Sequence, residues 1–398
     1  MKCLTFSKLK GIVEAPKSKS IQQRVLICNF LSGRELVVDN PIISDDVIIV
    51  LNSLIHFNSC NEFYMGESGF ALRVLPIIFS AFREKNIFKL SHSLSKRPYL
   101  NELQEIGLSI EVVSDEDVVI LNCSGSIYSG EFEIDCSKTS QSLTALLMIL
   151  PIMSQDSKIR VKNLQSEPYI NLTIEILKSY NITITRSNFN EFYIPGNQKY
   201  SKLYDYDECD WSGASFLISA AAIASEESIV ISGLRQNPSQ ADYSITELLK
   251  KSNVKFSQRT NSFEVFKSKI ESFEFDFADC PDLVPAIIPI AINSNEICYL
   301  NNVNRLIFKE SNRIESLILE YAKLGISIKQ DGKSLIVKPG KIKSGLVDPH
   351  NDHRIAMSLA VSALKVSETI CISNPQCVSK SYPGFWNDII KIGAIVNE

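Results

Sequence analysis

Charged and hydroxyl side chains stand at the entrance of an apolar run near the N-terminus of this chain. The segment SKSIQQRVLICNFL places Lys19 and Ser20 at a predicted helix start and Arg24 about one turn further on. Two cations and a hydroxyl at that spacing could face one anionic ligand. Taken alone, the segment is more typical of a capped surface helix with solvated charges.

A second helix entrance carries no charge. In TSQSLTALLMILP, Thr139, Ser140 and Gln141 offer two hydroxyls and an amide before an uncharged first turn. Such a start can hold a phosphate through hydrogen bonds without a salt bridge. An N-cap hydroxyl with nothing bound explains the pattern equally well, so both interpretations stay open.

The segment FKESNRIESL brings both signs of charge to one predicted helix. Lys309 and Arg313 share a face at a spacing of four, and Glu310 can pair with Arg313 at a spacing of three. In isolation, an exposed pair of this kind contributes roughly a few tenths of a kcal/mol. Asp282 in DCPDLVPAI and Lys380 in CVSKSYPGFW are equally ordinary when each is taken alone.

Two of the four histidines lie in DPHNDHRIAM, where the HxxH spacing raises the question of a metal. His350 and His353 precede the predicted helix instead of sharing one of its faces, and no third ligand is evident. Arg354 beside them would repel a cation. The segment therefore favours anion binding by His353 and Arg354, and we predict no metal site.

Helix openings of this kind recur along the chain and define its architecture. A stretch with Ser, Gly, Lys or Asp leads into an apolar run near Ser18, Gly69, Thr139, Ser212, Pro281 and Asn351. Each is a helix start whose unpaired N–H groups and dipole favour an anion. Amphipathic helices that run into β-branched strands recur out of phase with them, as in NELQEIGLSIEVV. The chain is therefore predicted to be an α/β protein of about six βαβαββ units.

Composition and charge limit the class of protein. The 398 residues are 45% hydrophobic and 22% charged, which suits two globular domains with separate cores. No apolar run reaches the length of a membrane span, and the N-terminus lacks the core of a signal peptide. A net charge of -4 gives no basic field for nucleic acid. Ten cysteines without a CxxC pair argue against a zinc site or a disulfide framework and for a reducing cytosol. From these features together we expect a cytoplasmic protein with neither a membrane nor a nucleic-acid partner.

Two polar interruptions of the repeat mark candidate domain crossings. One lies near Val13 to Pro16, and the other lies in KYSKLYDYDECD before Trp211. If the chain crosses at both, residues 16–208 form one three-unit α/β domain. Residues 1–15 and 209–398 then form the second.

In their order along the chain, these segments resemble a known family. The series APKSKS, GESGFALR, SKRP, TSQSLTALLM, QSEPYI, DCPDLVPA, FKESNR, DPHNDHRIAM and VSKSYPGFW is similar to that of the 5-enolpyruvylshikimate-3-phosphate synthases, over essentially the whole chain. The resemblance implies the two-domain enolpyruvyl transferase fold, an inside-out α/β barrel with three repeats per domain. It also implies an active site in the interdomain cleft.

The resemblance implies an activity as well. Members of the family transfer the enolpyruvyl group of phosphoenolpyruvate to the 5-hydroxyl of shikimate 3-phosphate and release phosphate, with no metal or organic cofactor. By motif position, Lys19, Asp282 and Glu310 correspond to the catalytic residues. Lys19 resembles a proton donor, and the two carboxylates resemble the groups that take the hydroxyl proton and move the methyl proton.

Further residues correspond by motif position to the family's substrate ligands. Those for shikimate 3-phosphate are Lys19, Ser20, Arg24, Thr139, Ser140, Gln141, Ser166, Asp282 and Lys309. Those for phosphoenolpyruvate are Lys19, Gly69, Arg97, Gln141, Arg313, Arg354 and Lys380. Because the cations come from both predicted domains, we expect the domains to close on the two substrates. A monomer is the default expectation.

Some positions depart from the family pattern. In GESGFALR, Glu67 and Phe70 stand where the family has Asn and Thr, which leaves open the substrate affinity and the response to the family's inhibitor glyphosate. Asn171 replaces an Asp. The position near Arg305, where the family often has an Asn, stays unassigned.

Two other functions fit parts of the pattern. An enolpyruvyl transferase acting on UDP-N-acetylglucosamine shares the fold, but it would be expected to show a GGKN-like opening and a catalytic Cys loop where this chain has SKS and SKRP. A non-catalytic anion-binding relative would be expected to lose Lys19, Asp282 or Glu310, and all three are present.

Overall fold

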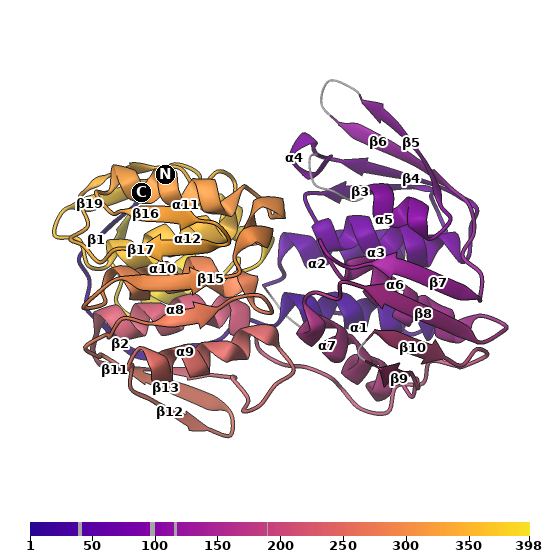
Figure 1. Ribbon diagram of the computed structural model, residues 1–398, viewed down its shortest axis with the longest axis horizontal. Helices are drawn as coiled ribbons and strands as arrows, with labels where there is room; N and C mark the ends of the chain where they lie inside the picture. Colours follow the sequence, from indigo (N-terminus) through magenta and orange to yellow (C-terminus); the bar gives the residue numbers. More distant parts are fainter. Residues whose placement is uncertain (39–41, 96–99, 115–117, 189) are drawn as a thin grey trace. The chain divides into compact units, whose positions relative to one another are not determined.

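A computed structural model describes residues 1–38, 42–95, 100–114, 118–188 and 190–398 of the chain. The chain divides into two compact units, which Figure 1 colours along the sequence. The terminal unit comprises residues 1–18 and 208–398, and the central unit comprises residues 19–207. Each unit has its own hydrophobic core. Within the described residues, no helix combines the length and the apolar character that a membrane crossing requires.

Each of the predicted openings leads into a helix that begins within three residues of the expected position. These helices are α1 (Lys19–Leu31), α3 (Gly69–Ser80), α6 (Gln141–Ile149), α8 (Trp211–Ala224), α10 (Val284–Ile292) and α12 (His353–Ala363). Every residue of α8, α10 and α12 is buried, which is typical of helices that are covered on all sides.

The amphipathic helices also form where the sequence predicts them. They are α2 (Asp45–Ile55), α5 (Leu100–Glu105), α7 (Glu167–Ser179), α9 (Ile245–Lys251), α11 (Arg313–Lys323) and α13 (Phe385–Lys391). The shorter segments are α4 (His92–Ser95) and the 3-10 turns η1 (Leu150–Ile152), η2 (Ala241–Ser244), η3 (Pro281–Leu283), η4 (Asn304–Phe308) and η5 (Pro375–Lys380).

The strands of the described residues form five four-stranded sheets that share one plan. In the central unit, one sheet has the spatial order β3 (Glu62–Gly66), β4 (Lys85–Leu90), β6 (Val119–Ser124), β5 (Ser109–Ser114). The other has the order β7 (Glu131–Asp135), β8 (Ser157–Lys162), β10 (Glu191–Ile194), β9 (Thr185–Asn188). In the terminal unit, the first sheet has the order β2 (Leu9–Glu14), β11 (Ser225–Ser232), β13 (Ser262–Phe266), β12 (Phe256–Arg259). The second has the order β14 (Glu274–Asp276), β15 (Cys298–Asn301), β17 (Ser334–Val337), β16 (Ile328–Asp331). The third has the order β18 (Gly345–Val347), β19 (Thr369–Ile372), β1 (Lys2–Thr5), β20 (Val396–Asn397).

In each sheet the first two strands run parallel and the remaining neighbours run antiparallel. This repetition confirms the predicted α/β repeat. The first expected repeat differs, because residues 19–38 and 42–61 hold α1 and α2 but no strand.

Buried helices occupy the centre of the terminal unit. Helices α8, α10 and α12 contact one another, and together they contact strands of all three sheets of the unit. The sheets therefore surround the helices, which is the inside-out arrangement expected from the sequence (Figure 1). The first residues of α8, α10 and α12 lie at an end of this central bundle, so side chains from different helices can meet there.

The N-terminal segment belongs to the terminal unit. Strand β2 completes one sheet beside β11, while β1 lies between β19 and β20, so both chain ends share a sheet (Figure 1). Where the chain passes between the units, the two connecting segments run antiparallel, with Lys17 bridged to Cys209.

One cysteine pair departs from the sequence-based expectation. The irregular spacing of the cysteines argues against a disulfide framework, yet Cys3 on β1 and Cys371 on β19 form a disulfide. The two residues are direct cross-strand partners in the sheet register. Sequence spacing could not reveal them because 368 positions separate them. The other eight cysteines form no disulfide, and seven of these are buried.

Candidate active site

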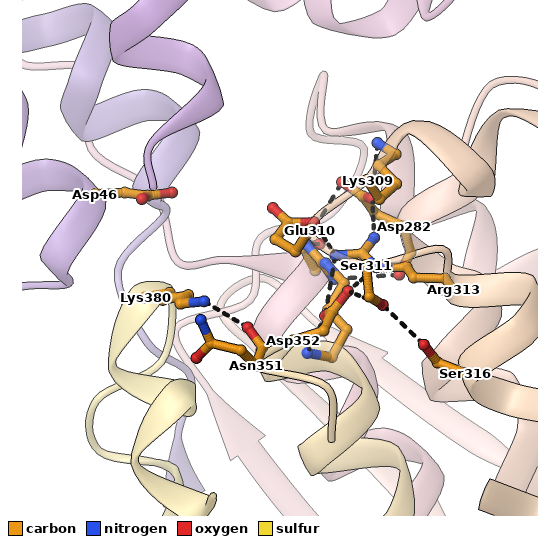
Figure 2. Close-up of polar contacts among 12 residues, drawn as sticks. Asp46, Asp282, Lys309, Glu310, Ser311, Arg313, Ser316, Asn351, Asp352 and Lys380 are labelled. Atoms are coloured by element: carbon orange, nitrogen blue, oxygen red, sulfur yellow. Dashed lines mark hydrogen bonds and ion pairs between the residues drawn. The ribbon is translucent and has the colours of Figure 1, made fainter. Parts of the chain in front are cut away.

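The centre of the candidate site in the terminal unit is the guanidinium of Arg313, the first residue of α11. Its Nη1 donates to Oδ1 of Asp282 at 2.8 Å, its Nη2 to Oε2 of Glu310 at 2.5 Å, and its Nε to Oδ2 of Asp352 at 2.8 Å (Figure 2). Burial alone would lower the pKa of Arg313, but the three carboxylates outweigh it and raise that pKa. Arg313 is therefore a fixed positive charge held by three charge-assisted hydrogen bonds.

Asp282 receives further cations. It lies in η3, and its carboxylate is 3.0 Å from Nζ of Lys309 and 3.6 Å from Nη2 of Arg354. Burial would raise the pKa of Asp282, but the charges of Lys309, Arg354 and Arg313 hold it well below its ordinary value. The carboxylate is thus ionised at neutral pH, and it is a weak base while these cations surround it.

Lys309 lies between η4 and α11, with its ammonium against Asp282. Burial lowers the pKa of Lys309, although the negative charge of Asp282 opposes that shift. The predicted pairing of Glu310 with Arg313 is present, but the predicted shared helix is wrong, because α11 begins only at Arg313 and both Lys309 and Glu310 precede it. Lys309 and Arg313, which are four residues apart, meet at one carboxylate.

Asp352 joins two motifs that the sequence analysis treats separately. As the N-cap of α12, its side chain accepts from the backbone N–H of Arg354 at 2.9 Å while it also holds Arg313. Sequence reasoning missed this residue. The signal was present, because an Asp directly before a helical run is a common N-cap.

Arg354 links α12 to two other elements. Its Nη2 donates to Oγ of Ser212 on α8 at 2.6 Å, and its Nη1 donates to the backbone carbonyl of Asp282 at 3.2 Å. The guanidinium is buried among them. Its position explains how residues far apart in the sequence form one cluster.

Lys380, at the end of η5, contacts the loop before α12. Its Nζ donates to the backbone carbonyl of Asn351 at 2.5 Å (Figure 2). His350 and Asn351 have positive φ angles of 52° and 56°, and Nε2 of His350 lies 2.8 Å from Oε1 of Glu320. Within the residues described, no three His, Cys, Asp or Glu side chains are arranged to hold a metal.

In the central unit, Lys19 is the first residue of α1 and forms an ion pair. Its Nζ donates to Oδ2 of Asp46 on α2 at 2.8 Å, and Nε2 of Gln23 donates to the carbonyl of Asp46 at 3.1 Å. Sequence reasoning missed Asp46 as well. The paired acids of SDDV at a helix start were its only signal.

Arg24 is held by neighbours from three helices. Its Nε donates to Oγ1 of Thr173 on α7 at 2.9 Å, its Nη1 donates to the carbonyl of Ser20 at 2.8 Å, and its guanidinium lies 5.1 Å from the ring centroid of Phe70 on α3. Burial lowers the pKa of Arg24 to about 10, so the side chain remains charged at neutral pH. Phe70, one of the departures from the family pattern, thus supports a predicted ligand of shikimate 3-phosphate.

Gly69 and Gln141 are bridged by an arginine. Nη1 of Arg73 donates to Oε1 of Gln141 at 3.0 Å and to the carbonyl of Gly69 at 3.2 Å. Oγ1 of Thr139 accepts from the N–H of Gln141 at 3.3 Å, and Ser140 is the N-cap of α6. The starts of α3 and α6 therefore lie together.

The remaining predicted residues are placed as follows. Ser166 is the N-cap of α7 and has a φ of 56°. Glu67, one of the departures from the family pattern, accepts from Ser93 Oγ at 2.7 Å. Arg305 is buried and donates to the carbonyl of Ala278. Arg97 lies outside the described residues, so its predicted contact with phosphoenolpyruvate stays a prediction.

Comparison with known proteins gives a consistent result. The family model described as EPSP synthase (3-phosphoshikimate 1-carboxyvinyltransferase) matches residues 54–389. A 3-phosphoshikimate 1-carboxyvinyltransferase of Clostridium perfringens is 33% identical over 423 aligned positions, which cover 99% of this chain and 98% of the relative. One from Clostridium novyi is 32% identical over 428 positions, with coverage of 98% and 97%.

Solved structures share the fold. An EPSP synthase from Acinetobacter baumannii matches with a TM-score of 0.78 at 18% identity, over 100% of both chains. The enolpyruvyl transferase NikO from Streptomyces tendae matches with a TM-score of 0.76 at 14% identity, over 100% of this chain and 98% of that one. The fold is therefore that of the enolpyruvyl transferases.

Within the enolpyruvyl transferases, the sequence relatives identify a narrower family than the fold does. The chain belongs to the EPSP synthase family, the 3-phosphoshikimate 1-carboxyvinyltransferases. The family resemblance drawn from the motifs is thereby confirmed.

Proposed function

We propose that this chain transfers the enolpyruvyl group of phosphoenolpyruvate to the 5-hydroxyl of shikimate 3-phosphate and releases phosphate. The observation that carries the proposal is the convergence of Asp282, Glu310, Arg313 and Arg354 in one buried network at the helix starts of the terminal unit. Two carboxylates beside several fixed cations suit a reaction that moves protons while it holds anions.

The charges of this network balance before a substrate arrives. Lys309, Arg313 and Arg354 supply three positive charges, and Asp282, Glu310 and Asp352 supply three negative charges. The network by itself is therefore a poor trap for an anion. We infer that cations of the central unit, among them Lys19 and Arg24, complete the site when the two units close.

In the proposed reaction, the 5-hydroxyl oxygen bonds to the phosphate-bearing carbon of phosphoenolpyruvate while the methylene carbon gains a proton. The tetrahedral intermediate then loses phosphate and a methyl proton, which restores the double bond. Lys19 is the proposed proton donor, while Asp282 and Glu310 take the hydroxyl proton and move the methyl proton between them. Substrate anions that draw Lys309 and Arg354 away would raise the pKa of Asp282 and make it a stronger base.

The remaining predicted residues serve as ligands in this proposal. Shikimate 3-phosphate is bound by Lys19, Ser20, Arg24, Thr139, Ser140, Gln141, Ser166, Asp282 and Lys309. Phosphoenolpyruvate is bound by Lys19, Gly69, Arg97, Gln141, Arg313, Arg354 and Lys380. The network between Gly69, Arg73 and Gln141 supports the shared position of two of these ligands.

A phosphate-release assay with both substrates tests the activity. We expect release from the unmodified chain, strong loss in Glu310→Ala, and full release in the matched control Glu226→Ala, whose carboxylate is exposed and lies 3.8 Å from Lys10. Retained binding of shikimate 3-phosphate without release would favour the non-catalytic anion-binding relative. Release with UDP-N-acetylglucosamine in place of shikimate 3-phosphate would favour the sister activity.

We also propose that the protein acts as a cytoplasmic monomer without a nucleic-acid partner. Its net charge of -4 supports the last point. Sedimentation at saturating substrate tests the monomer, and small-angle scattering tests closure. An unchanged scattering profile with both substrates bound would contradict closure.

A further inference from the structure

Asp242 is a buried carboxyl group that the proposed mechanism does not use. It lies in η2, which packs on α8, and only 2% of its surface is exposed. Neither of its carboxylate oxygens has a hydrogen-bond partner among the residues that the structure describes. A buried carboxyl group without a hydrogen bond is costly when ionised and far less costly when protonated.

The charged and titratable groups around Asp242 belong to the candidate site. Arg354 on α12 attracts the ionised form, while Asp282 in η3 and Asp210 at the start of α8 repel it. Cys280, which precedes η3, is also close enough to interact with Asp242. Asp242 therefore belongs to the same electrostatic cluster as Arg354, Asp282 and Asp210.

Ser212 interacts with both Asp242 and Arg354. The Ser212 hydroxyl oxygen accepts from Nη2 of Arg354 at 2.6 Å, so its own hydrogen is directed elsewhere. The hydroxyl lies near enough to Asp242 to favour its ionised form. Burial nevertheless dominates and raises the pKa of Asp242 to about 7.

We propose that Asp242 is a positioning residue for anion binding, which keeps the charge of Arg354 accessible to phosphoenolpyruvate by holding a proton. The inference rests on the proposed function, because it assigns Arg354 to that substrate. With Asp242 neutral, the acids that offset Arg354 include Asp282 but not Asp242. With Asp242 ionised, one more carboxylate offsets Arg354, and the incoming anion meets an additional buried negative charge.

The proposal predicts that anion binding and proton binding are linked. If only the neutral form of Asp242 accepts the anion, the apparent affinity scales with the neutral fraction. A carboxyl group titrating near pH 7 then weakens binding about tenfold between pH 6 and pH 8. Binding at pH 8 takes up nearly one proton, because phosphoenolpyruvate requires the form that is scarce at that pH.

The test measures the KM for phosphoenolpyruvate at saturating shikimate 3-phosphate from pH 6 to pH 8. The ratio of KM at pH 8 to KM at pH 6 is compared among the unmodified chain, Asp242→Asn, and Asp331→Asn as an exposed control on β16. Ionisation of the substrate affects all three alike. We expect a ratio about tenfold larger for the unmodified chain and the control than for Asp242→Asn. Equal ratios in all three proteins would overturn the proposal.

Calorimetry of the unmodified chain does not depend on the folding of a variant. Phosphoenolpyruvate is titrated at pH 8 in two buffers of different ionisation enthalpy, with and without shikimate 3-phosphate, and the proton uptake is calculated. Uptake close to one proton supports the proposal, and uptake near zero overturns it. Proton-linked binding without phosphate release would overturn the proposed function but support the role of Asp242, whereas no binding in any condition would overturn both.

Discussion

Arg313 and Asp352 form a buried ion pair that joins the starts of α11 and α12. Nε of Arg313 donates to Oδ2 of Asp352 at 2.8 Å, and their side chains are 1% and 0% exposed. Because Asp352 also caps α12 through the N–H of Arg354, one carboxylate fixes both arginines that are predicted to bind phosphoenolpyruvate. The pair therefore affects both stability and substrate binding.

Replacing Asp352 with Asn is expected to lower the free energy of unfolding by about 3–5 kcal/mol, because it leaves a buried guanidinium without one of its carboxylates. Urea unfolding measures the loss. The exposed control Asp331→Asn should change stability by less than about 0.5 kcal/mol. Equal stability of the two variants would show that the pair contributes nothing to the fold.

The stability of the protein should also depend on pH through Asp242. Burial raises its pKa to about 7, so between about pH 4 and pH 7 the folded state binds more protons than the unfolded state. The free energy of unfolding should therefore fall as pH rises through this window, by up to roughly 1.4 kcal/mol per pH unit. Asp282 has the opposite sign, since its lowered pKa gives stability that is lost only as the pH falls below the ordinary range of a carboxyl.

Denaturant titrations at intervals of half a pH unit measure this dependence. In Asp242→Asn the downward slope between about pH 4 and pH 7 should be reduced, while the loss at lower pH should remain. An unchanged slope would mean that Asp242 titrates at its ordinary pKa in the folded protein.

Phe70 is expected to act through Arg24. Phe70→Leu keeps an apolar side chain but removes the ring below the guanidinium, an interaction that contributes about 0.5–2 kcal/mol. The KM for shikimate 3-phosphate should therefore rise roughly 2- to 30-fold, with a smaller change in kcat. The matched control is Phe57→Leu, because the Phe57 ring lies 4.6 Å from the guanidinium of Arg83, away from the predicted ligands. A similar rise in both variants would indicate loss of packing only.

Local patterns predicted the helix starts well. Gly69 begins α3 and Arg313 begins α11 close to where composition changes from polar to apolar, since capping and burial depend on nearby residues. The ion pair of Glu310 and Arg313 was also predicted, although the helix on which that prediction relied begins only at Arg313.

Long-range partners could not be predicted in this way. Asp352 lies 39 positions from Arg313, and Asp46 lies 27 positions from Lys19. Only the packing of one helix start against another brings such side chains together. The family resemblance supplied Asp282 as a site residue, but it did not indicate that three cations already surround its carboxylate in this structure.

Asp46 is expected to be required for the position of Lys19. Asp46→Asn removes a charge-assisted hydrogen bond of 2.8 Å, and such bonds contribute about 1.5–3 kcal/mol. If Lys19 is the proton donor, kcat/KM should fall roughly tenfold to a hundredfold. The neighbouring Asp45→Asn removes an exposed acid from the same helical turn and is the matched control. Equal activity of the two variants would argue that the ion pair does not position Lys19.

The disulfide between Cys3 and Cys371 should stabilise the terminal unit by restraining the unfolded chain. Reduction is expected to lower the free energy of unfolding by about 2–5 kcal/mol, and Cys3→Ser should be as stable as the reduced protein. Thiol titration of the unfolded protein checks the bond directly, with eight thiols expected before reduction and ten afterwards. Ten thiols without a reductant would show that the bond does not form under those conditions. Because a reducing cytoplasm keeps most thiols free, the same titration on protein alkylated inside cells would show which state is present where the enzyme works.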